Sequence, residues 1–205
     1  MKIVDVEQNT DEWLELRKGK IGGTDLGAMY SKRGGRKIGF YEVIAQRLGI
    51  ERDHEDRMER GHRLEQEAID KFTEITGKTV DRVGICVADF NDDIINSPDG
   101  LIKGRGKNLY TEAIEVKCLS PARHLQAVIE DKVPDEFESQ KLQYFIVNED
   151  LQTLYFVFYD PSIPSVPIHT IEVLRADNLE KIEQFKQFQI EQLAEMDEIV
   201  ERLAF

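Results

Sequence analysis

The chain has 205 residues, of which 40% are hydrophobic and 33% charged, and a formal net charge of −13 at pH 7. These values are typical of one globular domain with a full core, so residues 1–205 are interpreted as a single domain. No apolar run approaches the ~20 residues of a membrane span, and the start lacks a signal-peptide core, so we expect a cytoplasmic protein without a membrane partner. Two cysteines, Cys86 and Cys118, predict buried free thiols rather than disulfides.

The first part of the chain carries helix signals. Capping residues and apolar periodicity predict helices over 10–18, from Thr24 onward, over 40–48 and over 57–76, with a basic loop at 31–39. The first of these has a capping hydroxyl before it, and the last ends at a glycine.

The second part mixes strands and helices. Alternating β-branched residues predict strands over 80–87, 94–96 with 101–102, and 110–118. Two prolines open helices over 121–129 and 134–148, strands follow over 151–159 and 168–174, and Asp177 caps a long final helix. This order predicts an α/β fold with a mixed sheet and helices on both faces.

Two short acidic segments carry the most informative pattern. A Ser-Pro-Asp-Gly turn contains Asp99, and a strand-like Ile-Glu-Val-Lys segment contains Glu115 and Lys117. Side chains two apart on a strand share a face, so Glu115 and Lys117 point to the same side, and the turn can deliver Asp99 there. Mg²⁺ prefers carboxylates, carbonyls, waters and phosphate oxygens, and the Val116 carbonyl completes such a set. The pattern predicts a Mg²⁺-dependent phosphodiesterase; a hairpin with solvated charges is the alternative.

The acidic net charge argues against nucleic-acid binding, but the charges are segregated along the chain. Phosphates are usually bound by basic patches, and basic residues concentrate at 17–20, 32–37 and 103–107. Acidic residues dominate 180–201, within the final helix. An acidic outer surface around a basic channel would satisfy both facts, although a solvated helix face is the simpler explanation of the acidic stretch.

Seven segments also form a larger pattern when taken in order. They lie at 12–17, 21–25, 58–65, 97–101, 115–118, 134–147 and 155–161. Their order and spacing resemble the lambda-exonuclease/YqaJ-type viral recombinase nucleases of the PD-(D/E)XK superfamily. The resemblance covers nearly the whole chain and implies a central mixed β-sheet flanked by helices on both faces.

The resemblance implies a Mg²⁺-dependent double-strand DNA exonuclease that works 5′ to 3′ and leaves 3′ overhangs for phage-type recombination by single-strand annealing. Asp99 and Glu115 would be metal ligands, with the Val116 carbonyl as a further ligand, for two Mg²⁺ ions that Mn²⁺ can replace. Lys117 would orient the attacking water and stabilise charge on the phosphate.

Two further site residues follow from the resemblance. Glu65 matches an acidic position of the long helix, is expected to be partly buried, and needs a partner such as a metal-bound water or Lys117. A catalytic-site glutamine is expected on the helix after Pro134. Counting from that proline favours Gln140, and Gln143 stays open as the alternative.

Arg17, Thr24 and Ser97 match the family's positions for binding the terminal 5′-phosphate. An arginine fork, a hydroxyl at a helix start and a hydroxyl beside the metals would together form an anion site. For Thr24, a plain helix cap is the simpler role. The segment after Asp99 is longer than the family pattern, and its basic residues at 103–107 are expected in a hairpin that contacts DNA.

The resemblance also implies partners: duplex DNA ends, a homotrimeric ring, and a single-strand annealing protein on the outer surface, in a bacterial cell that carries a phage or prophage. Three alternatives remain: a nuclease of other polarity, an endonuclease, and a catalytically inactive DNA-end-binding module. The presence of Asp99, Glu115 and Lys117 argues against the inactive module.

Overall fold

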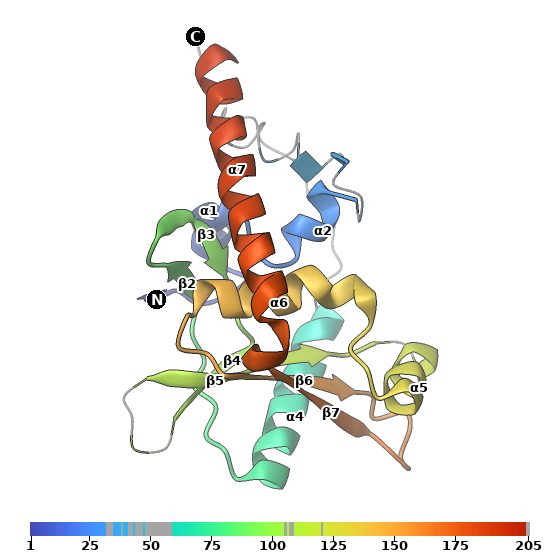
Figure 1. Cartoon of the computed structure of the whole chain (residues 1–205). Helices are drawn as coiled ribbons and strands as arrows, with labels where there is room; N and C mark the ends of the chain where they lie inside the picture. Colours follow the sequence, from blue (N-terminus) through green and yellow to red (C-terminus); the bar gives the residue numbers. More distant parts are fainter. Residues whose placement is uncertain are drawn as a thin grey trace.

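The computed structural model describes residues 1–31, 35–37, 39–40, 43, 47, 59–104, 106, 109–119 and 121–203. In this part of the chain the strands form two β-sheets (Figure 1). The smaller sheet is antiparallel and contains β1 (Lys2–Val4), β2 (Ile85–Ala88) and β3 (Asn91–Asn96). The larger sheet has the order β4 (Gly100–Lys103), β5 (Tyr110–Lys117), β6 (Thr153–Tyr159), β7 (Ile168–Leu174). Since β5 and β6 run parallel and the other pairs antiparallel, this sheet is mixed.

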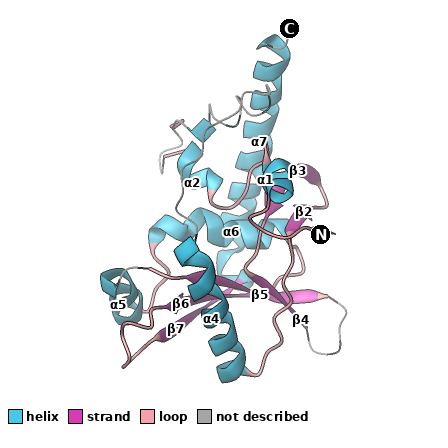
Figure 2. Ribbon diagram, turned by 180° about the vertical axis from the view of Figure 1, so that it is seen from behind, coloured by secondary structure: helices cyan, strands magenta, loops and turns pink. Residues whose placement is uncertain are grey.

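Helices lie on both faces of the larger sheet. The helices are α1 (Asp11–Arg17), α2 (Asp25–Met29), α4 (Glu59–Thr76), α5 (Pro121–Glu130), α6 (Glu138–Val147) and α7 (Leu179–Leu203), with 3-10 turns at Asp135–Phe137 and Arg175–Asn178. α4 covers one face of the sheet, whereas α6 lies between the two sheets (Figures 1 and 2). α7 packs against α6, which it crosses at a steep angle, and extends away from the larger sheet (Figure 1). The predicted α/β class with helices on both faces is thus confirmed.

The alternation of β5 divides its side chains between two environments. Ile114 and Val116 are buried against α4, together with Ile69 and Phe72 of that helix. Glu115 lies between them in sequence and therefore points to the opposite face, toward α6. Each fully buried aliphatic or aromatic side chain contributes about 1.5–3 kcal/mol, so these apolar neighbours fix the register that holds Glu115 inward.

Most predicted elements are present, with local differences. Thr10 caps α1 by accepting a hydrogen bond from the Trp13 amide, and Gly77 ends α4 with a left-handed φ of 66°. The strand expected over 80–87 begins only at Ile85, and β1 was not predicted. Asp177 does not cap the last helix, because it lies in the 3-10 turn before it.

Other predictions fall partly on undescribed residues or need correction. Most of the helix expected over 40–48, and part of the loop over 31–39, lie outside the described residues. Cys86 is buried, which raises the pKa of its thiol to about 12, but Cys118 is only half-buried, contrary to the prediction. None of the described helices is long and apolar enough to cross a membrane.

Candidate active site

The two carboxylates of the acidic pattern meet at the edge of β5. Glu115 is only 3% exposed, and Asp99 lies in the turn between β3 and β4. The Val116 amide donates a hydrogen bond of 2.7 Å to Oδ2 of Asp99, which holds this carboxylate beside the strand. Burial, followed by the charges of Glu115 and Glu65, raises the pKa of Asp99 well above its usual range, while Lys117 opposes the shift. Negative charge is therefore concentrated here in a low-dielectric environment.

Lys117 lies on the same side of β5 as Glu115, as the alternation predicts. Its Nζ is 2.5 Å from Oε1 of Glu115 and donates to Oε1 of Gln140 at 2.8 Å. The Gln140 amide in turn donates to Glu115. The ammonium also lies 4.6 Å from the ring centroid of Phe137. The lysine is thus held by a carboxylate, an amide and an aromatic face, which leaves little freedom in its direction.

The two candidate glutamines of α6 have different environments. Gln140 contacts the lysine and the carboxylate, whereas Gln143 is fully buried and donates to the carbonyls of Ile95 at 2.9 Å and Ile21 at 3.3 Å. A Cβ at Gly23 would lie 3.0 Å from the Gln143 Cβ, so the glycine permits this close approach. The geometry favours Gln140 as the site residue and gives Gln143 the task of joining the 21–23 segment to β3.

Tyr144 is a site residue that the sequence reasoning missed. It is 2% exposed, its hydroxyl is 2.5 Å from Oε2 of Glu115 and 3.1 Å from the carbonyl of Ile114, and it accepts from the Asp99 amide at 3.2 Å. Burial and the two carboxylates raise the pKa of Tyr144 well above its usual range, so its proton stays available as a donor. Its position four residues after Gln140, on one helix face, was the available signal.

Glu65 is placed near this group, with a different partner from the expected one. Its side chain is 20% exposed, and it accepts a hydrogen bond of 2.9 Å from Arg82, which also donates to Gln66 at 2.9 Å. The observed partner is thus Arg82 and not Lys117, which was one of the two partners expected; the other, a metal-bound water, stays a prediction. Because its charge contributes to the raised pKa of Asp99, Glu65 still acts on the site electrostatically.

Of the three residues expected at a 5′-phosphate, Arg17 and Ser97 are in direct contact, and Ser97 lies two residues before Asp99. Arg17 donates to Oγ of Ser97 at 2.7 Å and stacks 4.5 Å from the Trp13 ring centroid. Its side chain is 19% exposed, and burial lowers its pKa. Thr24 stands at the start of α2, but its hydroxyl makes no capping hydrogen bond. The simple capping role is thus not observed, and Thr24 is an exposed residue.

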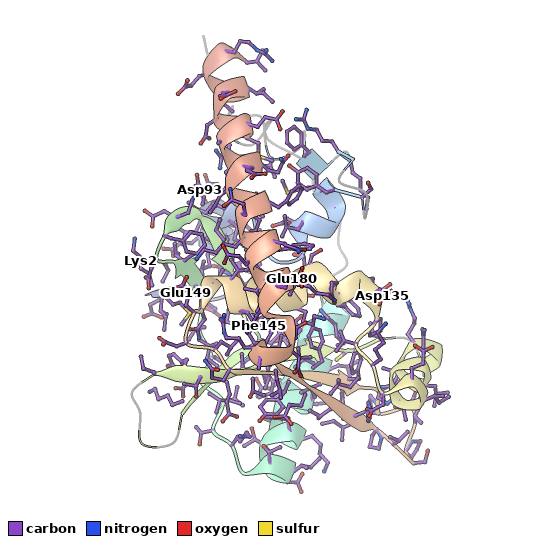
Figure 3. The ribbon with its side chains drawn as sticks, viewed as in Figure 1. Lys2, Asp93, Asp135, Phe145, Glu149 and Glu180 are labelled. Carbon is purple, nitrogen blue, oxygen red and sulfur yellow. The ribbon has the colours of Figure 1, made fainter. Side chains whose placement is uncertain are left out.

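Some basic residues of the described part of the chain form ion pairs with acidic side chains of the same chain. Lys20 and Arg47 pair with Asp93 at 3.4 and 3.0 Å, and Arg47 also pairs with Asp197 of α7. Asp93 is labelled beside α7 in Figure 3. Arg36 likewise pairs with a glutamate of α7. Part of the acidic face of α7 therefore forms ion pairs with basic residues of the same chain. Arg105 and Lys107 lie outside the described residues.

The donor set fits a hard divalent cation. Among the described residues, no group of three or more His, Cys, Asp and Glu side chains is arranged to hold a metal ion. Two carboxylates, Asp99 and Glu115, and the carbonyl of Val116 are nevertheless the mixture that Mg²⁺ prefers, since it keeps several waters or phosphate oxygens. Burial and the charges of Glu115 and Glu65 raise the pKa of Asp99, and a bound cation would favour its ionised form.

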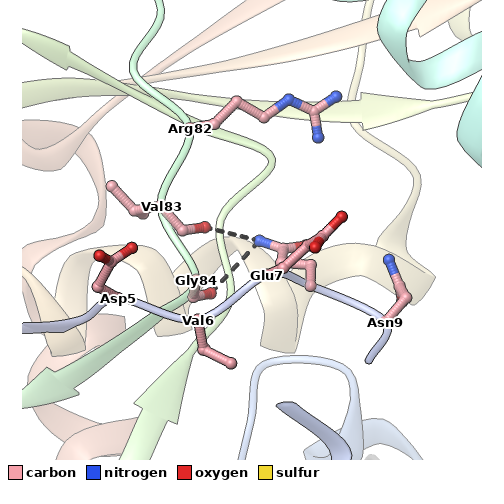
Figure 4. A pocket seen from close by; sticks show the side chains of 8 residues that line it. Asp5, Val6, Glu7, Asn9, Arg82, Val83 and Gly84 are labelled. Atoms are coloured by element: carbon pink, nitrogen blue, oxygen red, sulfur yellow. Dashed lines mark hydrogen bonds between the residues drawn. The ribbon is translucent and has the colours of Figure 1, made fainter. Parts of the chain in front are cut away.

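A cavity of about 600 Å³ (Figure 4) lies beside the turn that contains Asp99. It is lined by residues 5–9 and 82–84. Gln8 in its wall donates to the carbonyls of Val83 at 2.9 Å, Gly84 at 3.3 Å and Pro98 at 3.0 Å. The wall therefore reaches the residue before Asp99, although none of the carboxylates at the β5 edge lines the cavity.

Comparisons with known proteins agree with this geometry. A family model for the YqaJ-like viral recombinase domain matches residues 12–150. The chain is similar to an alkaline exonuclease from Laribacter hongkongensis, with a TM-score of 0.81 and 27% identity over 95% of this chain and 96% of that chain. The same exonuclease in complex with dAMP gives a TM-score of 0.78 at 27% identity, over 95% and 98%. No curated protein sequence matches.

A phage-related exonuclease from Haemophilus somnus 129PT shares the fold alone, at 15% identity and a TM-score of 0.56 over 90% of this chain and 94% of that chain. The full-length similarity to the alkaline exonuclease makes this protein a nuclease enzyme, as the resemblance implied. Because the family model covers more than half of its length, the chain belongs to the YqaJ-like viral recombinase domain family.

Proposed function

We propose that residues 1–205 form a single Mg²⁺-dependent exonuclease domain that digests one strand of duplex DNA 5′ to 3′. The 3′ overhangs that remain would serve phage-type recombination by single-strand annealing. The observation that carries the proposal is the position of Lys117 between Glu115 and Gln140, next to Asp99. Two neighbouring carboxylates and an oriented ammonium are the groups that phosphodiester hydrolysis needs. The known complex of a similar exonuclease with dAMP is consistent with a mononucleotide product.

Asp99, Glu115 and the Val116 carbonyl would hold the metal, as two Mg²⁺ ions that Mn²⁺ can replace. When bound, the ions lower the pKa of the attacking water and neutralise charge on the phosphate. Lys117 orients that water and donates to a phosphate oxygen. Gln140 fixes the lysine, because its carbonyl accepts from the ammonium at 2.8 Å.

Further side chains keep this set in place. Tyr144 holds Glu115 and the Asp99 amide through one hydroxyl. Glu65 adds negative charge behind Asp99, which strengthens the attraction for cations. Since these side chains are held by hydrogen bonds before DNA arrives, little reorganisation is needed during the reaction.

The polarity follows from the anion site proposed at Arg17, Ser97 and Thr24. Ser97 lies two residues before Asp99 and accepts from Arg17 at 2.7 Å. A terminal 5′-phosphate bound here would place the next phosphodiester at the carboxylates. This spacing supports release of single nucleotides from the 5′ end.

Digestion of end-labelled duplex DNA tests the proposal. We expect mononucleotides from the 5′-phosphorylated strand with Mg²⁺ or Mn²⁺, slower digestion of 5′-hydroxyl ends, and none with EDTA. Release from the 3′ end would indicate the other polarity, cleavage of circular duplex would indicate an endonuclease, and binding without cleavage would indicate an inactive end-binding module.

The proposal includes assembly and partners. We propose a homotrimeric ring around duplex DNA, and an annealing protein bound to the outer surface, in the cytoplasm of a bacterial host that carries the phage or prophage. The acidic face of α7 would attract a basic partner and repel the product strand. Light scattering after gel filtration tests the trimer. Co-purification with the annealing protein of the same operon at low salt tests the second contact, and failure of an active exonuclease to associate would reject it.

A further inference from the structure

The carboxylate of Asp25 lies at the proposed 5′-phosphate site in a position suited to a phosphate oxygen. Its Oδ2 accepts the amide hydrogen of Gly22 at 2.9 Å and is 3.7 Å from Nη2 of Arg17. A backbone amide and a guanidinium are the two kinds of donor that typically bind phosphate oxygens. Asp25 therefore uses donors that an incoming phosphate would need.

Asp25 and Arg17 both approach the backbone of Gly22 closely. A Cβ built on Gly22 would lie 2.9 Å from the Asp25 carboxylate and 3.0 Å from the Arg17 guanidinium. Both side chains thus close directly over the backbone of Gly22. A phosphate that reaches the Gly22 amide must displace the carboxylate, since the same amide hydrogen cannot serve both well.

Arg17 does not depend on Asp25 for its position. Its other nitrogen, Nη1, donates to Ser97 at 2.7 Å, and its guanidinium stacks on Trp13 at 4.5 Å. At 3.7 Å the pair with Asp25 is an ion pair without a hydrogen bond. Removal of the carboxylate charge should leave the arginine in place and make it more available to another anion.

We propose that Asp25 competes with the terminal 5′-phosphate for Arg17 and the Gly22 amide, and so limits how tightly a phosphorylated end is held. The inference rests on the proposed 5′-phosphate site. In each cycle water attacks the phosphorus, the bond to the 3′-oxygen breaks, and that oxygen leaves with a proton. The mononucleotide keeps the old 5′-phosphate, and a new one remains on the shortened strand.

This cycle explains what a competing carboxylate does. The old phosphate must leave the site before the new one can enter it. A site with only donors would retain the product, whereas a carboxylate that returns to Arg17 and Gly22 favours its release. Asp25 is a specificity-determining residue in this scheme, because it acts on the 5′-phosphate and not on the bond that breaks.

The test compares Asp25→Asn with Asp11→Asn. Asn keeps the shape of Asp25 and an oxygen acceptor for Gly22 but loses the charge, and Asp11 is an exposed carboxylate in the first turn of α1. Calorimetric titration with dAMP in EDTA measures affinity without turnover. We expect Asp25→Asn to bind dAMP about tenfold more tightly, as like-charge repulsion at short range allows, and Asp11→Asn to match wild type.

Kinetics give a second readout. For 5′-phosphorylated duplex, Asp25→Asn should lower KM and lower kcat, because product leaves slowly. Release of the first nucleoside from a 5′-hydroxyl end should change little, since that product carries no 5′-phosphate. Weaker or unchanged dAMP binding would overturn the inference, since Asp25 would then position Arg17 or do nothing at the site. If Asp25→Asn does not fold, Asp25→Ser is measured in the same way. If wild type itself shows no preference for 5′-phosphate, the proposed phosphate site fails, which is a separate result.

Discussion

Lys117 and Gln140 are joined by a hydrogen bond of 2.8 Å although they come from a strand and a helix 23 residues apart. The glutamine carbonyl accepts from the ammonium while its amide donates to Glu115. One amide group therefore sets the distance between the cation and the carboxylate. This arrangement leads to the first prediction.

Gln140→Ala should lower kcat about ten- to hundredfold, with little change in KM for DNA ends, because the lysine loses its orientation but not its charge. Steady-state digestion of 5′-phosphorylated duplex measures both constants. A matched loss in Gln143→Ala would contradict the distinction between the two glutamines.

For Gln143→Leu, the expected loss is in stability. Its two hydrogen bonds to the carbonyls of Ile21 and Ile95 are buried, and unsatisfied buried polar groups cost about 1–3 kcal/mol each. Urea unfolding should show a free energy of unfolding lower by about that amount. An unchanged unfolding midpoint would mean that the 21–23 segment is held in other ways.

Asp99→Asn and Glu115→Gln should each abolish hydrolysis while the protein stays folded and binds DNA, since each removes a proposed metal ligand. Residual activity within about tenfold of wild type would reject the assignment. Lys117→Ala should lose a comparable amount of activity but still bind the metal, because an ammonium is not a ligand.

Mg²⁺ should raise the unfolding temperature of the DNA-free protein. Burial and then the charge of Glu115 raise the pKa of Asp99, so its ionised form is disfavoured in the fold, and a cation that binds only the folded state stabilises it. Asp99→Asn should be more stable than wild type in EDTA and should respond weakly to Mg²⁺. Thermal melts with and without Mg²⁺ measure both effects; an equal response in the two proteins would place the metal elsewhere.

Arg17→Ala should selectively remove the preference for phosphorylated ends. A charge-assisted contact to phosphate contributes about 1.5–3 kcal/mol, which corresponds to a loss of about ten- to a hundredfold in kcat/KM on such ends. Ends with a 5′-hydroxyl should release their first nucleoside nearly as fast as in wild type, and this first turnover is the step to compare. Equal losses on both substrates would make Arg17 a structural residue.

The sequence alone was enough to predict which side chains of β5 lie on the same face, because the alternation of side chains along a strand depends only on neighbouring residues. Glu115 and Lys117 share a face wherever the strand lies, and the structure places them 2.5 Å apart. The choice between Gln140 and Gln143 could not be made from spacing, since a helix start uncertain by one residue rotates both side chains by about 100°. In the structure the register of α6 on β5 brings Gln140, and not Gln143, into contact with Lys117.

Contacts between distant segments were beyond the sequence reasoning. The pairing of Glu65 with Arg82 depends on how α4 ends and the chain returns across the sheet, and many nearby charges could have served instead. Likewise, β1 has only three residues and is defined by its partner β2. The N-cap at Thr10, in contrast, could be predicted because a cap hydrogen bond joins residues that are close in sequence.

Helix α6 joins three parts of the site, because Gln140 contacts Lys117, Gln143 contacts Ile21, and Tyr144 contacts Asp99 and Glu115. A transient opening of this one helix would disconnect Lys117, the 21–23 segment and the two carboxylates simultaneously. Heat inactivation should then be a single cooperative step that precedes or coincides with exchange of the α6 amide hydrogens. The protein would have no partially active thermal intermediate, since the helix that supports one function supports all three.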